Sequence, residues 1–209
     1  MELMVVLTIS AVLMAIAVPN VQRITQVLRI SGDLRDLNGT VSQAKMNAAA
    51  DFTHARARAN LAANTFQAEI WNKAGNAGAG CWQTLGDGVN PCTGAASPVQ
   101  QLSAGVTFGF DKLGTPPANT QAALGQAAAC NNGPAGIVGA PAGVIAGTAC
   151  IEFNSRGLPI DAAGNPTGQG AFYINNGTMV YGLTVAATGN ALNWSVADAS
   201  GSNASWKHQ

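Results

Sequence analysis

Residues 1–20 read MELMVVLTISAVLMAIAVPN, and this stretch decides how the rest of the chain is interpreted. Glu2 is followed by an uncharged, almost wholly apolar run from Leu3 to Val18, and then by Pro19. A carboxylate at the edge of such a run is energetically expensive unless it has a partner. Three interpretations compete: a secretory signal peptide, a transmembrane anchor, and a helix that uses both the apolar run and the acid.

The first two interpretations each fit the sequence incompletely. A signal peptide has a basic segment before its apolar core, whereas here an acid occupies that place, although Ala15-Ile16-Ala17 resembles a cleavage site. A transmembrane helix needs about 20 apolar residues. The sixteen residues from Leu3 to Val18 are slightly too few, unless residues upstream complete the span.

The apolar pattern continues beyond Pro19 at steps of three and four residues, which indicates one apolar stripe on an amphipathic helix. We expect Pro19 to kink this helix without ending it. The sequence therefore predicts two domains: residues 1–28 form an apolar helix, and residues 29–209 form a globular domain that includes the amphipathic half of the helix. The stripe consists of Val21, Ile24, Leu28, Leu34, Leu37, Val41, Ala44 and Ala48, and the charged residues Arg23, Arg29, Asp33, Arg35, Asp36 and Lys45 occupy the other, solvated or partner-facing side.

The stretch from Glu2 to Pro19 resembles the N-terminus of type IV pilins and of the pseudopilins of type II secretion. In that family a processed Phe-Thr-Leu-Ile/Met-Glu-Leu start precedes an apolar helix and a proline, and the spacing here matches. The leader and the first mature residues of the family are absent, so we expect Met1 to be an internal methionine. A prepilin peptidase is an expected partner if a leader exists upstream.

The resemblance implies a role for each part of the helix. Glu2 would attract the N-terminal amine of a neighbouring subunit, which gives the carboxylate its partner in an apolar bundle. The apolar run would anchor the chain in the bacterial inner membrane before assembly, and would form the filament core with other copies or other pilins afterwards. Glu2 and Pro19 are thus the expected assembly residues, and the globular domain would be periplasmic or extracellular.

The four cysteines, Cys81, Cys92, Cys130 and Cys150, form no CxxC pair, and the chain has only two histidines. They therefore favour two disulfides in an oxidising compartment over a metal site. Three pairings are possible. We expect the sequential one, Cys81–Cys92 and Cys130–Cys150, because short loops lose the least entropy on closure.

The rest of the chain predicts strands separated by Gly- and Asn-rich turns. Thr65 to Trp71 is one, and Asn176-Gly177 is the strongest hairpin signal. The last three strand regions, residues 149–160, 170–176 and 179–194, are similar to the C-terminal sheet of the FimT/GspH branch of the pilin family. We expect the C-terminal residues 198–209 to be mobile. The other strand regions are 105–110, 149–160, 170–176 and 179–194, and the low-complexity segment 131–150 is expected to be a surface loop leading into a strand.

Catalytic chemistry is not evident. The acids are scattered singly, and His54 is expected on a solvated helix surface. The chain carries ten basic and ten acidic residues, a balance that argues against nucleic acid as a partner. We therefore expect no enzyme, no cofactor and no metal ion.

The sequence predicts an α+β protein in which a long, kinked N-terminal α-helix packs on a mainly antiparallel β-sheet, the pilin fold. The expected function is that of a minor, FimT/GspH-like subunit of a type IV pilus or a type II secretion pseudopilus. The alternatives are a principal subunit that forms the bulk of a filament, a DNA-binding minor pilin and an ordinary anchored enzyme.

Overall fold

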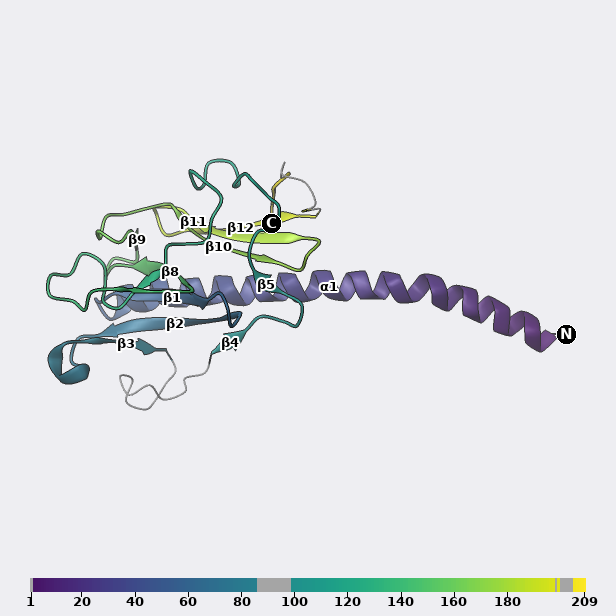
Figure 1. Cartoon of the computed structure of the whole chain (residues 1–209), viewed down its shortest axis with the longest axis horizontal. Coiled ribbons are helices and arrows are strands. Elements are labelled where there is room, and N and C mark those ends of the chain that lie inside the picture. Colours follow the sequence, from purple (N-terminus) through teal and green to yellow (C-terminus); the bar gives the residue numbers. More distant parts are fainter. Residues whose placement is uncertain (1, 86–98, 198, 200–204) are drawn as a thin grey trace.

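The computed structural model of the chain describes residues 2–85, 99–197, 199 and 205–209. One long helix, α1 (Glu2–Ala50), projects from a β-rich globular part (Figure 1). Its backbone is described throughout, whereas the side chains of Glu2, Leu3, Val5, Leu7, Thr8, Ile9, Ala11, Ile16, Pro19 and Asn20 are outside the described part.

Within the described residues, the strands form two large antiparallel sheets and one two-stranded sheet. The first has the order β3 (Cys81–Thr84), β2 (Thr65–Asn72), β1 (Ala55–Asn60), β8 (Thr148–Phe153), β9 (Pro159–Ile160), and β4 (Gln100–Gln101) also pairs with β2. The second has the order β13 (Lys207–His208), β12 (Ala191–Val196), β11 (Val180–Val185), β10 (Gly170–Asn175), β5 (Thr107–Phe108). A short hairpin joins β6 (Cys130–Asn131) to β7 (Val144–Ile145), and the turn before β3 holds the 3-10 helix η1 (Asn76–Gly78).

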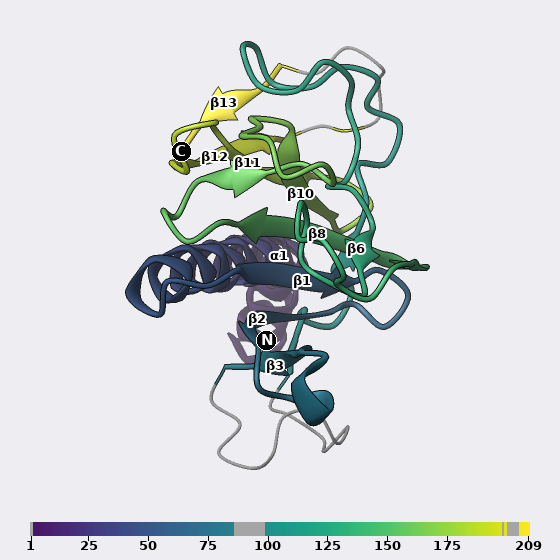
Figure 2. The ribbon, with the colours of Figure 1, turned by 90° about the vertical axis from the view of Figure 1, so that its left-hand side faces the viewer.

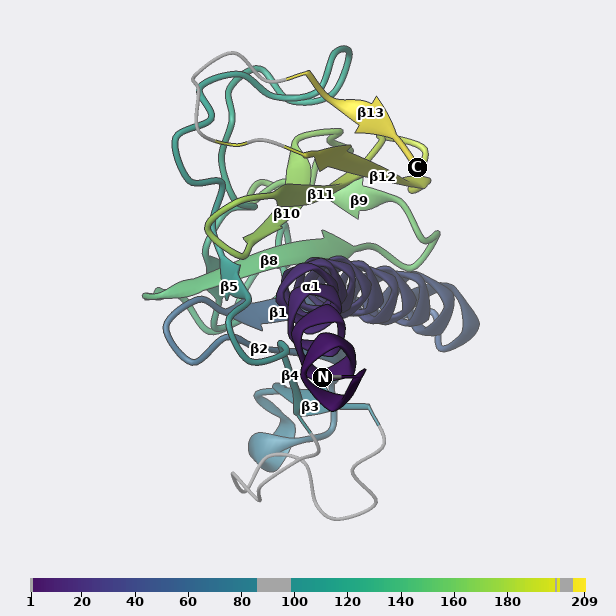
Figure 3. The same cartoon turned by 90° about the vertical axis from the view of Figure 1, so that its right-hand side faces the viewer.

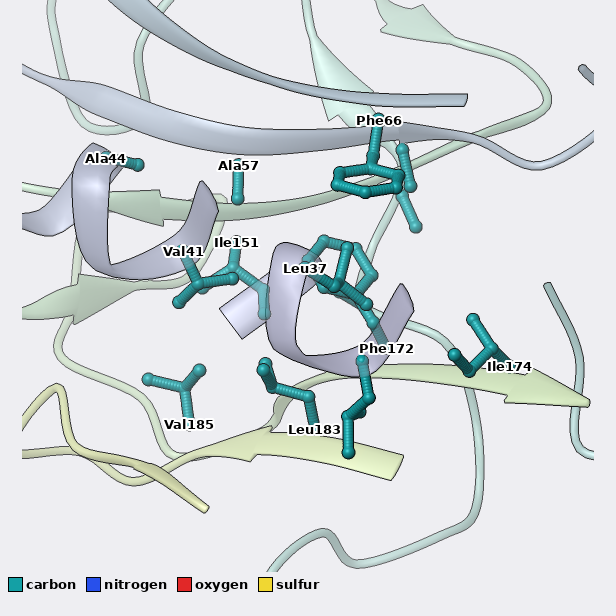
Figure 4. Packing of buried hydrophobic residues seen from close by; sticks show 14 of the residues in the cluster. Leu37, Val41, Ala44, Ala57, Phe66, Ile151, Phe172, Ile174, Leu183 and Val185 are labelled. Atoms are coloured by element: carbon teal, nitrogen blue, oxygen red, sulfur yellow. The ribbon is translucent and has the colours of Figure 1, made fainter. Parts of the chain in front are cut away.

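The second half of α1 packs against both sheets. Figure 3 looks along the helix from its N-terminal end, with β10 to β12 above it and β1 to β3 beside and below it. Leu37 and Val41 contact Phe66 and Ala57 of the first sheet on one side and Leu183 of the second on the other (Figure 4). One hydrophobic core therefore joins the helix to both sheets. The helical residues in it are Ile30, Leu34, Leu37, Val41, Ala44 and Ala48.

Strand β1 shows how the sequence builds this core. Its alanines, Ala55, Ala57 and Ala59, are buried beneath the helix, because alternate residues of a strand point to the same face. Their small side chains let the helix approach the sheet closely. Arg56 and Arg58 alternate with them and lie on the opposite face.

The hairpin between β10 and β11 forms at Asn176-Gly177, as the sequence predicts. Gly177 has φ +81°, a conformation that favours glycine. The side-chain oxygen of Asn176 accepts hydrogen bonds from the backbone N–H groups of Thr178 and Met179, at 3.1 and 2.9 Å. Local turn chemistry therefore favours this register.

The α+β class is confirmed, and so are the strands expected at 65–71, 149–160, 170–176 and 179–194. Other expectations differ from the structure. The strand expected at 105–110 is only Thr107–Phe108, and the loop expected at 131–150 contains the β6–β7 hairpin. The helix lies against two sheets instead of one. The described end of the chain is also ordered. Lys207–His208 pairs with β12, and Trp206 packs against Tyr173 in a tilted arrangement and donates a hydrogen bond to the carbonyl oxygen of Thr115.

Candidate functional site

The first part of α1 extends beyond the globular part (Figure 1). Ile30 is the first buried side chain among the described residues of the helix. At a rise of 1.5 Å per residue, the helix projects by about 42 Å before it reaches the sheets. We call residues 2–29 the projecting helix.

Large apolar side chains of the projecting helix are exposed to solvent. Val21, Ile24 and Leu28 belong to the apolar stripe that the sequence predicts, but they lie before the edge of the two sheets and are 58–63% exposed. The packed stripe begins at Ile30, since only from there does the helix face sheet residues. The other exposed members among the described side chains are Met4, Val6, Val12, Leu13, Met14 and Val18, each at least 54% exposed, and Val27, which is 38% exposed.

Polar contacts hold the second half of the helix in place. Asp33 is buried, and its carboxylate accepts hydrogen bonds from the backbone N–H and the hydroxyl of Ser103, at 3.0 and 2.8 Å. Lys45 donates to the carbonyl oxygen of Gly189 at 3.0 Å. Both residues were expected on a solvated or partner-facing side of the helix, and they tie the helix to loops of the globular part. The projecting helix is thus the continuation of a helix that the globular part holds in a fixed position.

The expected assembly residues both belong to this helix. Glu2 begins α1, and the helix continues through Pro19 without a break. Figure 1 shows its purple N-terminal end bending away from the axis of the remainder. The side chains of Glu2 and Pro19 are outside the described part of the structure, so their assembly role stays a prediction.

The inner-membrane location predicted from the sequence is wrong. Within the described residues, no helix is both long enough and apolar enough to cross a membrane. The physical reason is the length of the apolar run, since sixteen residues of helix span about 24 Å, whereas a hydrocarbon core is about 30 Å thick.

A buried ionic cluster lies on the face of the first sheet that points away from α1. The Nε atom of Arg56 lies 2.5 Å from Oε2 of Glu69, and Nη1 of Arg58 lies 3.1 Å from Oε1 of the same carboxylate. The Arg56 guanidinium also lies over the ring of Trp82, with its Cζ atom 4.0 Å from the ring centroid. Desolvation by burial lowers the pKa of Arg56, and the charge of Glu69 opposes this effect.

His54 belongs to the same face. It follows the end of the helix, its side chain is only 14% exposed, and its Nδ1 atom lies 2.8 Å from Oε1 of Glu152. The expectation of a solvated helix surface is wrong, because the chain turns into β1 directly after His54. Glu152 Oε1 also accepts a hydrogen bond from the backbone N–H of Ala135 at 2.8 Å. The pair thereby holds the loop before β7 against β8.

Sequence reasoning missed this cluster, although one signal was present. The alternation Ala-Arg-Ala-Arg at residues 55–58 indicates a strand whose second face carries charge. The partner was hidden, because the pairing of Arg56 with Glu69 depends on the register between β1 and β2.

The predicted disulfide between Cys130 and Cys150 is confirmed, and it ties β6 to β8. Cys81 is also disulfide-bonded. Cys92 is outside the described residues, and so is the predicted Cys81–Cys92 pairing.

No protein-family model, no curated protein and no solved structure matches this chain. The projecting helix and the sequence resemblance are therefore the features that point to a function.

Proposed function

We propose that this protein is a pilin-like structural subunit, which assembles with other copies or related subunits through its projecting helix. The more specific proposal is a minor subunit of the FimT/GspH type in a type IV pilus or a type II secretion pseudopilus. The exposed apolar surface of residues 2–29 carries the proposal. Other helices of the same kind are the partner that best fits it.

The exposed apolar side chains of the projecting helix have an unfavourable free energy in water. Burying a valine, leucine or isoleucine side chain that was exposed is worth about 1.5–3 kcal/mol. The projecting helix displays at least eight such side chains, counting methionine, along about 42 Å. Monomeric soluble proteins rarely display so large a continuous apolar surface. Side-by-side packing of several such helices would remove it from water.

The arrangement of the globular part supports the same proposal. The second half of α1 is held by the shared core and by Asp33 and Lys45, so the projecting helix leaves the globular part in a fixed direction. A fixed direction allows identical subunits to repeat one contact between neighbouring helices, and a repeated contact that does not close on itself produces a filament. A long N-terminal helix packed on antiparallel strands is also part of the layout that the sequence resemblance implies, although that layout has a single sheet.

We further propose that the subunit is neither an enzyme nor a DNA-binding protein. Arg56, the most buried of the basic residues in the strands, is engaged by Glu69, and Arg58 shares that carboxylate. Neither is free to neutralise a phosphate. The remaining basic residues of the globular part after residue 70 are Lys73, Lys112, Arg156 and Lys207.

The test is an assembly assay on purified protein. We expect the full chain to form filaments or bundles visible by electron microscopy, and we expect a chain beginning at Arg29 to be soluble and monomeric with its sheets intact by circular dichroism. Leu13→Asp should abolish assembly, because it places a charge within the apolar surface. The matched control is Thr188→Asp, which places the same charge in an exposed turn.

Two results would contradict the proposal. One is a full chain that remains monomeric at every concentration tested without detergent, and the other is a Leu13→Asp variant that assembles like the parent chain. The abundance of the protein in filaments sheared from cells then separates a minor subunit, present in trace amounts, from a principal subunit that forms most of the mass.

A further inference from the structure

A second apolar surface lies at the end of the molecule opposite the projecting helix. Residues 136–147 read GIVGAPAGVIAG and contain no polar side chain, and no charged residue occurs between Lys112 and Glu152. We call residues 130–145, from β6 to β7, the apolar hairpin. Figure 2 views the molecule from this end, with β6 toward the viewer and the projecting helix pointing away.

The base of the apolar hairpin is anchored to the first sheet. The Cys130–Cys150 disulfide joins it to β8. The carbonyl oxygen of Asn131 accepts a hydrogen bond from Nη1 of Arg56 at 2.5 Å. The bond from the Ala135 N–H to Glu152 adds a third tie. The buried ionic cluster therefore also positions this hairpin.

The two legs of the hairpin are held together by backbone contacts. The backbone N–H of Asn132 donates to the carbonyl oxygen of Gly143 at 2.9 Å, and its side-chain amide donates to the carbonyl oxygen of Ala142 at 3.1 Å. Gly133 lies so close to Pro141 that an added Cβ would be 2.7 Å from its carbonyl oxygen. These backbone contacts hold the hairpin without using the side chains of Ile137, Val138 and Val144.

Those side chains point into solvent. Val138 is 101% exposed, Val144 is 64% exposed and Ile137 is 50% exposed. Polar residues at these positions would keep every contact that anchors the hairpin and would avoid the exposure of apolar surface. A loop that is both held in shape and apolar loses little conformational entropy when a partner covers it, which is what a binding surface requires.

We propose that the apolar hairpin is a second self-association surface, and that its occupant is the projecting helix of another copy of this chain. Both surfaces are apolar. The hairpin is uncharged, and so is the projecting helix from Leu3 to Val18, so neither offers a charge that the other would have to bury unpaired. They lie at opposite ends of the molecule, so they cannot meet within one chain.

This inference depends on the proposed function, because it uses the same helix as the partner. It adds a different contact. The helix surface alone associates side by side, whereas a hairpin–helix contact is heterologous and relates the opposite ends of two subunits. Such a contact does not close on itself and extends the assembly along one direction.

The test uses the full chain with a photo-reactive amino acid at position 138. Two preparations, one labelled with a heavy nitrogen isotope, are mixed before assembly and illuminated, and the cross-linked peptides are mapped by mass spectrometry. We expect cross-links between position 138 of one copy and the projecting helix of another. Val138→Asp should weaken association about tenfold or more, because it removes the burial of one valine and places a charge in the contact. Thr188→Asp is the control and should have no effect.

The outcomes separate this inference from the proposed function. Assembly with cross-links confined to other surfaces, or with full strength in Val138→Asp, overturns the hairpin contact and leaves the helix-based function standing. Absence of any assembly overturns both. A third outcome is that the chain floats with uncharged lipid vesicles, that Val138→Asp abolishes this flotation, and that no cross-links to a second copy form. This outcome would assign the hairpin to a lipid surface and overturn the inference.

Discussion

Arg56 and Glu69 face each other directly across β1 and β2, and their side chains form an ion pair that is almost completely buried. Their exposed fractions are 1% and 4%. Such a pair contributes little net stability over a well-packed apolar pair, but the loss of one partner leaves an uncompensated buried charge. Arg56 also donates to the carbonyl oxygen of Asn131, so the pair links the first sheet to the apolar hairpin.

This relationship predicts an asymmetry between single and double substitutions. Arg56→Ala should lower the free energy of unfolding by about 3–5 kcal/mol, since Glu69 then remains buried with its charge unpaired. The double change Arg56→Met with Glu69→Leu should cost less than Arg56→Ala, because it removes both charges. Urea denaturation of the chain beginning at Arg29 measures both values. Arg156→Ala, at an exposed turn, is the control and should change the free energy by no more than about 0.5 kcal/mol. A double variant less stable than Arg56→Ala would contradict this account.

The Cys130–Cys150 disulfide closes a loop with a sequence separation of 20. Replacing both cysteines by alanine should lower the free energy of unfolding by about 3 kcal/mol, because the bond restricts the unfolded chain. Denaturation under non-reducing conditions measures the difference. Peptide mapping without reduction should also find Cys81 linked to Cys92, and a link between Cys92 and Cys130 would disprove the sequential pairing.

The chain has only two tyrosines, and burial raises the pKa of both Tyr173 and Tyr181. The folded state therefore favours the neutral phenols. Below the ordinary tyrosine pKa, both tyrosines are neutral in the folded and in the unfolded chain, and stability is unaffected by their ionisation. As the pH rises above that pKa, the tyrosines of the unfolded chain ionise first, and the folded state loses stability relative to it.

We expect the free energy of unfolding to fall between about pH 9 and pH 11, and to fall less steeply in Tyr173→Phe, which keeps the ring and removes the titrating group. Tyrosinate absorbance should stay low in the folded protein at pH values where it is already high in urea. Ordinary titration of both tyrosines in the folded chain would rule this out.

DNA binding should be weak. Firm binding requires several free basic residues near phosphates, and here Arg56 is buried while Arg58 shares the Glu69 carboxylate. A gel-shift titration of the chain beginning at Arg29 with duplex DNA at about 150 mM salt measures the affinity. Micromolar or tighter binding that is weakened by Lys207→Ala or Arg156→Ala would favour the DNA-binding alternative.

Glu2→Ala should leave the globular part folded and reduce incorporation into assemblies. A carboxylate within a bundle of apolar helices needs a positively charged partner, and the variant removes one member of that pair. Co-assembly of tagged variant and parent chains, followed by quantification of each, measures incorporation. Glu2→Gln is the control for side-chain size and should be impaired to a similar extent. Equal incorporation of variant and parent would exclude this role for Glu2.

Local patterns in the sequence determined a large part of this structure. The three- and four-residue spacing from Leu34 to Ala48 identified the buried face of α1, because that period belongs to the helix itself. Asn176-Gly177 identified a hairpin, because its turn depends on adjacent residues. Cys130–Cys150 followed from the short separation of the two residues. Each of these features depends on neighbours in the chain.

Only the tertiary structure decided the features that depend on distant segments. The apolar spacing includes Val21, Ile24 and Leu28, yet these side chains are exposed. Where the helix meets the two sheets is set partly by strands more than a hundred residues further along the chain. The partner of Arg56 depended on strand register, and the outward direction of Val138 depended on ties from β1 and β8 to the apolar hairpin. A sequence pattern states what a side chain is suited to contact, whereas the packing of the whole chain determines whether that contact is made within the molecule or is left for a partner.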